Sequence, residues 1–459
     1  MSKRKFTPLD PLLESDAIRA AAQTLIEAVQ HENAERSLAP AAYSRSVREL
    51  ERLRGRPLVY PFLASGAGRG ARVWLADGSM KLDFIGGIGV YGFGRGDSDL
   101  LQAAVVAAAG DVVFQGHLAP GPEYLRLSRA LLRHAGAKLK HVWLSLSGTD
   151  ANENALKILF QKHAPADKVV VFEGGFHGRT AMMAELTDRP GFRDGQPLAG
   201  RALYVPFYDA GDPDSTQKSV NALDAHLRRY PGRVAGMLFE IIQGEGGFRI
   251  GPREFHVALM ERCKQSGIGV WVDEVQTFAR TGMLYAFRSF GLDEYVDIAT
   301  AGKTLQGSAV LFSKEYNPRP GLVAGTYAGS TVAMAVGTRI IERLETEGYL
   351  GEGGRTIVLG RRIRKRFESL RKRVPKAVGE VRGLGAMQAF VPWHGSPEIA
   401  KALLTAAYEE GLILLSAGSK PTLIRMLPPV NTTDEELEAC FTMLEKAMRR
   451  VAEDHELPC

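Results

Sequence analysis

The chain has 459 residues, 45% hydrophobic and 24% charged, a composition typical of a globular protein with room for more than one domain. No stretch approaches the roughly 18 uninterrupted apolar residues of a membrane span, and residues 1–16 lack the apolar core of a secretory signal. Three scattered cysteines, Cys263, Cys440 and Cys459, are too few for a disulfide framework or a zinc site. We therefore expect a cytoplasmic protein with reduced thiols, no metal and no membrane contact.

The formal net charge of +6 raises the question of a nucleic-acid partner. Much of this charge lies in the segment 359–374, where apolar residues recur at steps of four, four, three and four: Leu359, Ile363, Phe367, Leu370 and Val374. This spacing predicts one buried helical face with the arginines and lysines turned to solvent. No aromatic residues alternate with the basic ones, so we expect no nucleic acid to bind.

The first part of the chain predicts helix and then a small meander of strands. Residues from about 11 to 55 are polar and alanine-rich, as expected of a helix, and end near the sequence RGRP. Residues 58–84 alternate apolar runs with glycine turns, which indicates a β-meander. We expect residues 1–95 to form a helical and β segment that packs with a smaller C-terminal domain.

From about residue 100, short apolar runs alternate with helical stretches such as 151–163 and 253–267, and the runs are HVWLSLS, KVVVFEGG, GMLFEII, IGVWVDE and DIATAG. Continuous apolar strands between helices predict a mostly parallel sheet covered on both faces. After about residue 345, a basic helix, a hairpin-like segment at 379–391 and two more helices predict a smaller α/β domain. The expected fold is α/β, with a large domain at 96–345 and a small domain at 346–459.

Residues with chemical potential follow the ends of these predicted strands. They are Ser147, Gly148 and Thr149, then Phe176 and His177, then Glu240, Asp273 and Lys303. Ligands of open α/β sheets bind outside the carboxyl ends of the strands. We therefore expect these residues to share one crevice, in which His177 braces a turn and has no catalytic role.

Asp273 and Lys303 together suggest a pyridoxal phosphate enzyme. This cofactor needs an amine to hold its aldehyde as a Schiff base and a carboxylate to keep its pyridine nitrogen protonated. Taken singly, Asp273 is better explained as a helix cap and Lys303 as a surface lysine. An unperturbed lysine has a pKa near 10.4 and is almost fully charged at neutral pH, so a catalytic Lys303 must lie where its pKa is lowered.

Two further segments fit the same cofactor, each with an alternative. Residues 147–149 lead into a predicted helix, whose N-terminus suits a phosphate. Ordinary capping by Thr149 or Asp150 explains this segment equally well. Phe176 is either a core aromatic or a flat plate stacked on a pyridine ring, and its position after a strand end favours the ring.

Several motifs in order resemble those of the class III, or ω-amino acid type, aminotransferases over residues 60 to 435: SGTDANENALK, FEGGFHGRT, FEIIQGEGG, VDEVQTFARTG, AGKTLQG, GST and RMLPPV. The resemblance implies a pyridoxal 5'-phosphate enzyme of fold type I, and a homodimer with active sites at the subunit interface. It implies that Lys303 forms the Schiff base and shuttles the proton, and that Asp273 partners the pyridinium. The remaining cofactor contacts it implies are Gln276 near the phenolic oxygen, Phe176 on the ring, Gly148 and Thr149 at the phosphate, Glu240 nearby, and Thr331 reaching the phosphate of the neighbouring subunit.

The resemblance also assigns the substrate side. Arg425 resembles the arginine that clamps a substrate carboxylate, and Glu245 resembles the gate that neutralises it when an amine-terminated substrate enters. The expected reaction moves the amino group of an ω-amino acid or diamine to 2-oxoglutarate, and the donor stays open among ornithine, acetylornithine, 4-aminobutyrate, lysine and longer diamines. The alternatives are a decarboxylase or aminomutase of the same fold, or a non-catalytic binding protein. The motif VDEVQTFARTG is one residue shorter than the usual one, which predicts a rearranged loop after Gln276.

Overall fold

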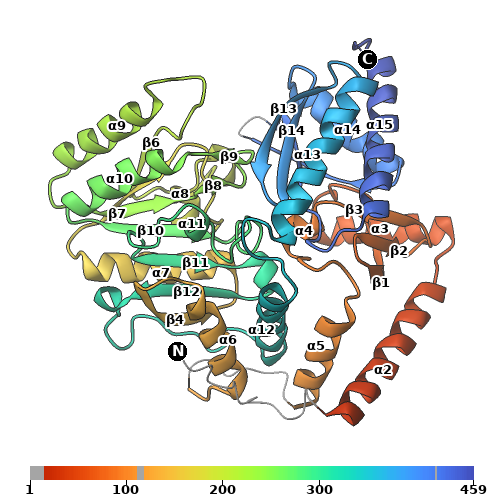
Figure 1. The fold of residues 1–459 in the computed structure, drawn as a ribbon, viewed down its shortest axis with the longest axis horizontal. Coiled ribbons are helices and arrows are strands. Elements are labelled where there is room, and N and C mark those ends of the chain that lie inside the picture. Colours follow the sequence, from red (N-terminus) through yellow and green to blue (C-terminus); the bar gives the residue numbers. More distant parts are fainter. Residues whose placement is uncertain (1–14, 111–117, 419–420, 459) are drawn as a thin grey trace.

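The computed structural model describes residues 15–110, 118–418 and 421–458. The chain forms two lobes, one built around a seven-stranded sheet and one built around two four-stranded sheets (Figure 1). These sheets, with helices packed on them, confirm the predicted α/β class with a mostly parallel central sheet. No helix in the described ranges is long and apolar enough to cross a lipid bilayer.

The strands of the central sheet are, in spatial order, β4 (Leu139–Ser145), β12 (Ser308–Ser313), β11 (Ile298–Ala301), β10 (Gly269–Glu274), β7 (Val234–Phe239), β5 (Lys168–Phe172) and β6 (Ala202–Val205). Strand β12 runs antiparallel to both of its neighbours, and the other strands run parallel to one another. Both faces are buried. On β5, Val170 packs with residues of α9 and α10, whereas Val169 packs with residues of α7. This alternation explains why the strands are apolar throughout.

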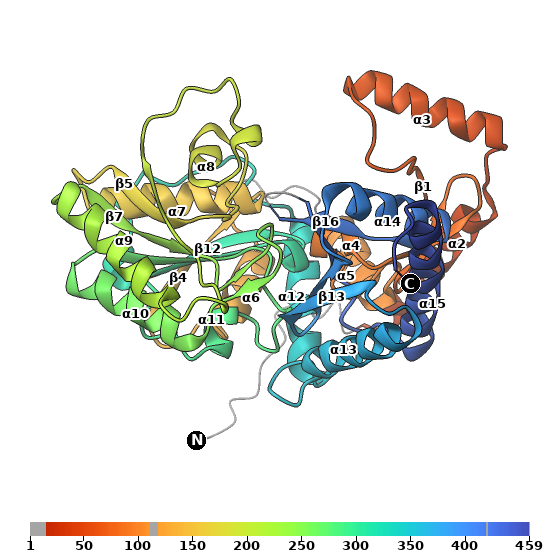
Figure 2. The same cartoon turned by 90° about the horizontal axis from the view of Figure 1, so that it is seen from above.

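Helices cover the two faces of this sheet (Figure 2). The helices of this lobe are α6 (Pro122–Arg133), α7 (Gly148–Lys162), α8 (Ala181–Leu186), α9 (Ser215–Arg229), α10 (Arg253–Gln265), α11 (Ala286–Ser289) and α12 (Thr331–Thr346). Helix α12 packs against α6 and against α5 (Ser98–Gly110). It therefore joins the central sheet to the N-terminal segment.

The second lobe combines a segment from the N-terminal part of the chain with the C-terminal part. Its antiparallel sheet consists of β13 (Val378–Leu384), β14 (Met387–Pro392), β17 (Leu423–Met426) and β16 (Leu415–Ala417). The predicted meander is present as β1 (Ala64–Arg69), β2 (Arg72–Leu75) and β3 (Met80–Asp83). Strand β3 pairs in parallel with β15 (Leu412–Ile413) of the C-terminal part. Three helices complete the lobe: α13 (Arg355–Arg373), α14 (Pro397–Glu409) and α15 (Asp434–Asp454).

Two helical predictions had different outcomes. The single helix expected at 11–55 is, over its described part, two helices, α2 (Asp16–Glu35) and α3 (Pro40–Arg54). Proline has no N–H and forces the preceding residue into extended backbone, so Pro40 begins a new helix. The apolar face predicted for the basic helix is confirmed, because Leu359, Ile363, Phe367, Leu370 and Val374 are all buried in α13 and its cap.

Candidate active site

The carboxyl ends of four neighbouring strands, β11, β10, β7 and β5, meet at one edge of the central sheet. Asp273 lies on β10 opposite Thr300 of β11, and Lys303 follows the end of β11 by two residues. The backbone of Lys303 is left-handed, with φ of 47°, which is uncommon for a residue with a side chain. Such strained residues concentrate at functional sites.

Asp273 is 5% exposed and accepts three hydrogen bonds. Its Oδ2 accepts from Asn152 Nδ2 at 2.8 Å and lies 2.9 Å from His177 Nδ1, and its Oδ1 accepts from the backbone N–H of Val275 at 2.9 Å. Asn152 in turn accepts from Thr300 Oγ1 at 2.7 Å. We call Asp273, Asn152, His177 and Thr300 the Asp273 cluster, and its hydrogen bonds fix the carboxylate in one orientation.

The sequence did not indicate two members of this cluster, Asn152 and Thr300, and it predicted His177 in the same crevice only as the brace of a turn. Asn152 is 1% exposed on the buried face of α7, among Ala151, Ala155 and Leu156. A polar residue within a buried apolar stripe needs a partner, and this is the signal that would have found it.

Glu240 follows β7 and is 6% exposed. Its carboxylate accepts from the backbone N–H groups of Phe176 and Gly244, both at 3.0 Å. Burial raises the pKa of Glu240 to about 7, helped by the charge of Asp273 and opposed by His177. Glu240 therefore ties the Phe176 turn to the segment that carries Glu245.

Lys303 is half-buried, and four ionisable groups act on its ammonium. Burial lowers the pKa of Lys303 to about 8; Arg425 also lowers it, whereas Glu245, Asp273 and Glu240 oppose this change. A lysine with this pKa has a substantial neutral fraction near neutral pH, as a nucleophilic amine requires. The charges of Asp273, Glu245 and Arg425 thus all act on Lys303.

The predicted phosphate segment forms the first turn of α7, with a different cap from the two considered. The N-cap is Ser147, whose side chain accepts from the backbone N–H of Asp150 at 3.2 Å, so capping by Thr149 or Asp150 is wrong. Among the described residues, the Thr149 hydroxyl has no hydrogen-bond partner. A Cβ on Gly148 would lie 2.5 Å from Val275 Cγ1, so only glycine fits there.

The remaining cofactor candidates are placed differently. Gln276 is 8% exposed, and its Oε1 is buried without a hydrogen-bond partner. The ring of Phe176 contacts Phe192 edge-on at 6.0 Å between centroids. Thr331 lies in the first turn of α12, and no hydrogen bond within the described ranges joins it to the Asp273 cluster.

On the substrate side, Arg425 of β17 is 3% exposed and its Nη1 lies 2.6 Å from Glu245 Oε1. Burial alone would raise the pKa of Glu245, but the charges of Arg425, Lys303 and Arg189 and the hydrogen bond from Arg425 hold it below its ordinary value. The Nε of Arg425 is buried without a partner. This arginine therefore has a spare donor for another acceptor.

Arg189 is a second guanidinium at this position that the sequence did not indicate. Its Nη2 donates to the backbone carbonyl of Glu245 at 2.9 Å, and its Nε is buried without a partner. Burial lowers the pKa of Arg189, and the charge of Glu245 opposes this while that of Arg425 adds to it. Both guanidinium groups thus bond Glu245, Arg425 through its carboxylate and Arg189 through its backbone carbonyl.

The loop after Gln276 is anchored by Arg280, which is fully buried. Arg280 donates to Thr304 Oγ1 at 3.1 Å, to the carbonyl of Pro428 at 2.5 Å and to the carbonyl of Gly89 at 2.9 Å. Burial lowers its pKa to about 10. These bonds fasten the residue after Lys303 to both the N-terminal segment and the second lobe.

The residues at this edge fit pyridoxal phosphate. A buried carboxylate suits a pyridinium nitrogen, and the unpartnered Gln276 Oε1, the uncommitted Thr149 hydroxyl and the helix N-terminus at Gly148 offer polar contacts that the protein itself does not use. A lysine with lowered pKa completes the set.

Comparison with known proteins identifies the family. The sequence profile of the family described as aminotransferase class-III matches residues 57–448. The acetylornithine aminotransferase of Thermosynechococcus vestitus is 30% identical, with 84% of this chain and 92% of that protein covered. A protein of Bacillus subtilis named probable 4-aminobutyrate aminotransferase is 33% identical, over 83% of this chain and 92% of that protein.

A solved structure titled lysine aminotransferase from M. tuberculosis in the internal aldimine form has a TM-score of 0.79 at 23% identity and covers 88% of this chain and 99% of that chain. This likeness shows that the chain has the same fold, as predicted. The family match confirms the resemblance found in the sequence motifs. The chain belongs to the class-III aminotransferases, which are pyridoxal-phosphate-dependent enzymes.

Proposed function

We propose that this aminotransferase binds pyridoxal 5'-phosphate and moves the terminal amino group of an ω-amino acid or diamine to 2-oxoglutarate. The observation that carries the proposal is the Arg425–Glu245 ion pair, whose two charges both act on Lys303. A carboxylate clamp that carries its own removable counter-ion suits an enzyme that takes two substrates of different charge in turn. A decarboxylase or aminomutase has no need of this exchange.

The chain's residues would hold the cofactor as follows. Asp273 would pair with the pyridine nitrogen, Gly148 and Thr149 would bind the phosphate, and Phe176 and Gln276 would contact the ring and its phenolic oxygen. When bound, the cofactor supplies an aldehyde and a protonated ring that accepts electrons. Lys303 would hold the cofactor through its Nζ, and the same Nζ, once released, would carry the proton taken from the substrate carbon.

Glu245 and Arg425 would sort the two substrates. With the ion pair closed, Arg425 is neutralised and an uncharged or amine-bearing chain end can lie against it. When 2-oxoglutarate enters, its carboxylate would replace Glu245 on the guanidinium, where a bidentate pair is worth about 1.5 to 3 kcal/mol per charged hydrogen bond. Arg189 supports this exchange, because it fixes the backbone of Glu245 while the side chain moves.

The donor class is supported by the printed names of relatives, which include acetylornithine, 4-aminobutyrate and 5-aminovalerate aminotransferases. These donors share a terminal amine on a short carbon chain and differ in chain length. Pocket walls separate such substrates by only about 1 to 3 kcal/mol per methylene. The choice among them is therefore a matter for direct measurement.

A donor panel tests the proposal. The purified protein with bound cofactor would be mixed with acetylornithine, ornithine, 4-aminobutyrate, 5-aminovalerate or lysine, without an acceptor. We expect at least one donor to bleach the yellow colour within seconds to minutes, and 2-oxoglutarate then to restore it with formation of glutamate. Release of carbon dioxide without glutamate formation would contradict the proposal, as would a protein that stays yellow with every donor.

We also propose a cytoplasmic homodimer. Thr331 lacks a bond to the Asp273 cluster, as expected if it serves the phosphate of a neighbouring subunit. Two large side chains are highly exposed, Leu146 at 61%, just before residues 147–149, and Tyr327 at 60%, four residues before Thr331. Exposed apolar side chains suit a subunit interface. Sedimentation analysis is expected to give about twice the 50.0 kDa chain mass, and a fully active monomer would overturn this proposal.

A further inference from the structure

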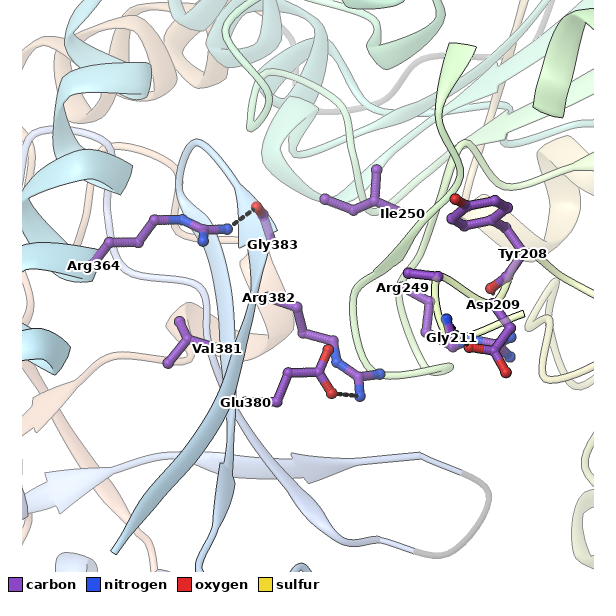
Figure 3. Close-up of a pocket in the computed structure, with 11 residues that line it drawn as sticks. Tyr208, Asp209, Gly211, Arg249, Ile250, Arg364, Glu380, Val381, Arg382 and Gly383 are labelled. Atoms are coloured by element: carbon purple, nitrogen blue, oxygen red, sulfur yellow. Dashed lines mark hydrogen bonds and ion pairs between the residues drawn. The ribbon is translucent and has the colours of Figure 1, made fainter. Parts of the chain in front are cut away.

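A cleft of about 750 Å³ lies between the two lobes (Figure 3). One wall comes from the central-sheet lobe and the other from α13 and β13, and the side chains that matter are Tyr208, Asp209 and Arg249 on the first wall and Arg364, Glu380 and Arg382 on the second. None of these residues is a candidate for the cofactor or the substrate. The volume is within the range of small-molecule sites.

The cleft carries more positive than negative charge. Three arginines, Arg249, Arg364 and Arg382, face two carboxylates, Asp209 and Glu380. Within the described part of the chain, Arg382 pairs with Glu380, and neither Arg249 nor Arg364 has a carboxylate within ion-pair distance. A concave surface with unbalanced guanidinium groups attracts anions.

The arginines are also held in place before any ligand binds. Arg364 donates to the backbone carbonyl of Gly383 at 2.5 Å, and Arg249 donates to that of Tyr208 at 3.0 Å. Of the five N–H donors of Arg249, three are used, because it also donates to the carbonyl of Phe207 and to Gln243 Oε1, so two remain for a ligand. The Nε of Arg382 is buried without a partner. Burial and the charge of Arg382 lower the pKa of Arg249, which shows that these two like charges are close.

We propose that this cleft is a second binding site, for a compact anion with two phosphate groups, held by Arg249 on one wall and by Arg382 and Arg364 on the other. Two acidic groups are needed because the guanidinium groups lie on opposite walls (Figure 3). Phosphate fits best, because it presents several acceptor oxygens to forked N–H donors. The anion replaces repulsion between the arginines with two sets of charge-assisted hydrogen bonds.

The site is linked to the active site through one short hairpin. Arg249 of β9 (Arg249–Ile250) pairs with Gln243 of β8 (Ile242–Gln243), and the turn between these strands carries Glu245. An anion on Arg249 therefore binds at the strand pair next to the turn that carries Glu245, the ion-pair partner of Arg425. Because its other contacts come from the second lobe, the same anion connects the two lobes.

Calorimetric titration of pyrophosphate into the protein saturated with pyridoxal 5'-phosphate tests the proposal, because the cofactor fills its own phosphate site. We expect Arg382→Gln to weaken pyrophosphate binding about tenfold or more, since it removes charged hydrogen bonds. Glu380→Gln is expected to strengthen binding, because it removes a competing carboxylate. Arg361→Gln removes one exposed arginine of α13, the helix that carries Arg364, outside the cleft; it is the control and should change the affinity less than twofold.

Thermal unfolding gives a second readout. Pyrophosphate is expected to raise the melting temperature of the cofactor-bound protein, and this rise should be lost in Arg382→Gln and kept in Arg361→Gln. If Arg382→Gln does not fold, Arg364→Gln and Glu380→Gln carry the test with opposite expected signs. The proposal is overturned if millimolar pyrophosphate does not bind to the wild type, or if Arg382→Gln and Arg361→Gln bind it equally. Neither readout depends on transamination.

Discussion

Asp273 and Arg425 are buried to a similar degree, with 5% and 3% exposed, but their hydrogen bonding differs. Both oxygens of Asp273 accept hydrogen bonds, and the two neighbours of Oδ2, Asn152 and His177, are also bonded to one another. Arg425 has one carboxylate partner, Glu245, and keeps a buried Nε without any. The region around Asp273 is therefore fixed by its hydrogen bonds. The region of Arg425 and Glu245 is exchangeable, because Arg425 has a spare donor for another partner.

This contrast matches two different tasks. A group that must keep one orientation toward a cofactor benefits from a satisfied network, because each bond restricts its side chain. A group that must receive two substrates in turn benefits from spare donors and a counter-ion that can leave. Charges of both regions act on Lys303.

The largest effect is expected when the Lys303 side chain, on which charges of both regions act, is removed. Lys303→Ala eliminates the amine that holds the cofactor and moves the proton, so we expect glutamate formation from 2-oxoglutarate to fall by more than about a thousandfold. Cofactor should still bind through the phosphate and ring contacts. Activity within tenfold of the wild type would show that Lys303 is not the catalytic amine.

The fixed region is tested by Asp273→Asn, which keeps the shape and removes the charge. We expect kcat to fall about tenfold to a hundredfold, since one charge-assisted bond to the pyridine nitrogen is worth about 1.5 to 3 kcal/mol. Asp167→Asn is the control, because Asp167 forms an exposed ion pair with Arg233 and such pairs contribute little. Equal rates for the two variants would remove Asp273 from the site.

The exchangeable region is tested by Arg425→Lys, which keeps the charge and loses the forked geometry. We expect KM for 2-oxoglutarate to rise about tenfold, with a smaller change in kcat. Glu245→Gln is the complementary variant. It should leave 2-oxoglutarate binding intact and weaken the preference for ω-amine donors, and an unchanged donor preference would argue against the gate.

The smallest effect is on pH dependence. Because the pKa of Lys303 is lowered to about 8, its ammonium dominates below that pH, and the rate at which cofactor-free protein captures pyridoxal phosphate should fall about tenfold per pH unit there. Above pH 8 the rate should level off. Glu245→Gln removes a charge that raises this pKa and should move the midpoint to lower pH, whereas Arg425→Gln should move it to higher pH.

The lowered pKa of Lys303 also makes the free energy of unfolding depend on pH. An unfolded lysine keeps its proton up to about pH 10.4, whereas folded Lys303 has lost it above about 8. Between these values the unfolded state binds more protons, so this group makes the free energy of unfolding of the cofactor-free protein rise with pH. Urea titrations at pH 8 and 10 should show this rise, and its absence from Lys303→Ala is the control.

The sequence predicted the features that repeat along the chain. Continuous apolar strands such as 168–172 and the four-residue spacing in α13 gave the central sheet and the basic helix directly, because burial sets these periods. The apolar runs that precede Asp273 and Lys303 predicted both residues at strand ends. The roles assigned to the site residues stay predictions until they are measured.

The features that the sequence did not predict depend on contacts between distant segments. Arg189 lies 56 residues from Glu245 along the chain, and His177 lies 96 residues from Asp273, so no local pattern pairs them. The break between α2 and α3 was missed although Pro40 marks it. Of the cleft arginines, only Arg364 lies in the segment predicted to be solvated, and Arg249 and Arg382 carried no prediction, because helical periodicity does not show what another lobe brings opposite a residue.

The most direct test of the central claim is chemical trapping of the cofactor. Borohydride reduces the bond between a lysine and pyridoxal phosphate to a stable amine, and peptide mass spectrometry then locates it. We predict a single modified peptide carrying the cofactor mass on Lys303, absent when the protein lacks cofactor. A modification at another lysine, or none in protein that binds the cofactor, would contradict the assignment of Lys303 and the active site built around it.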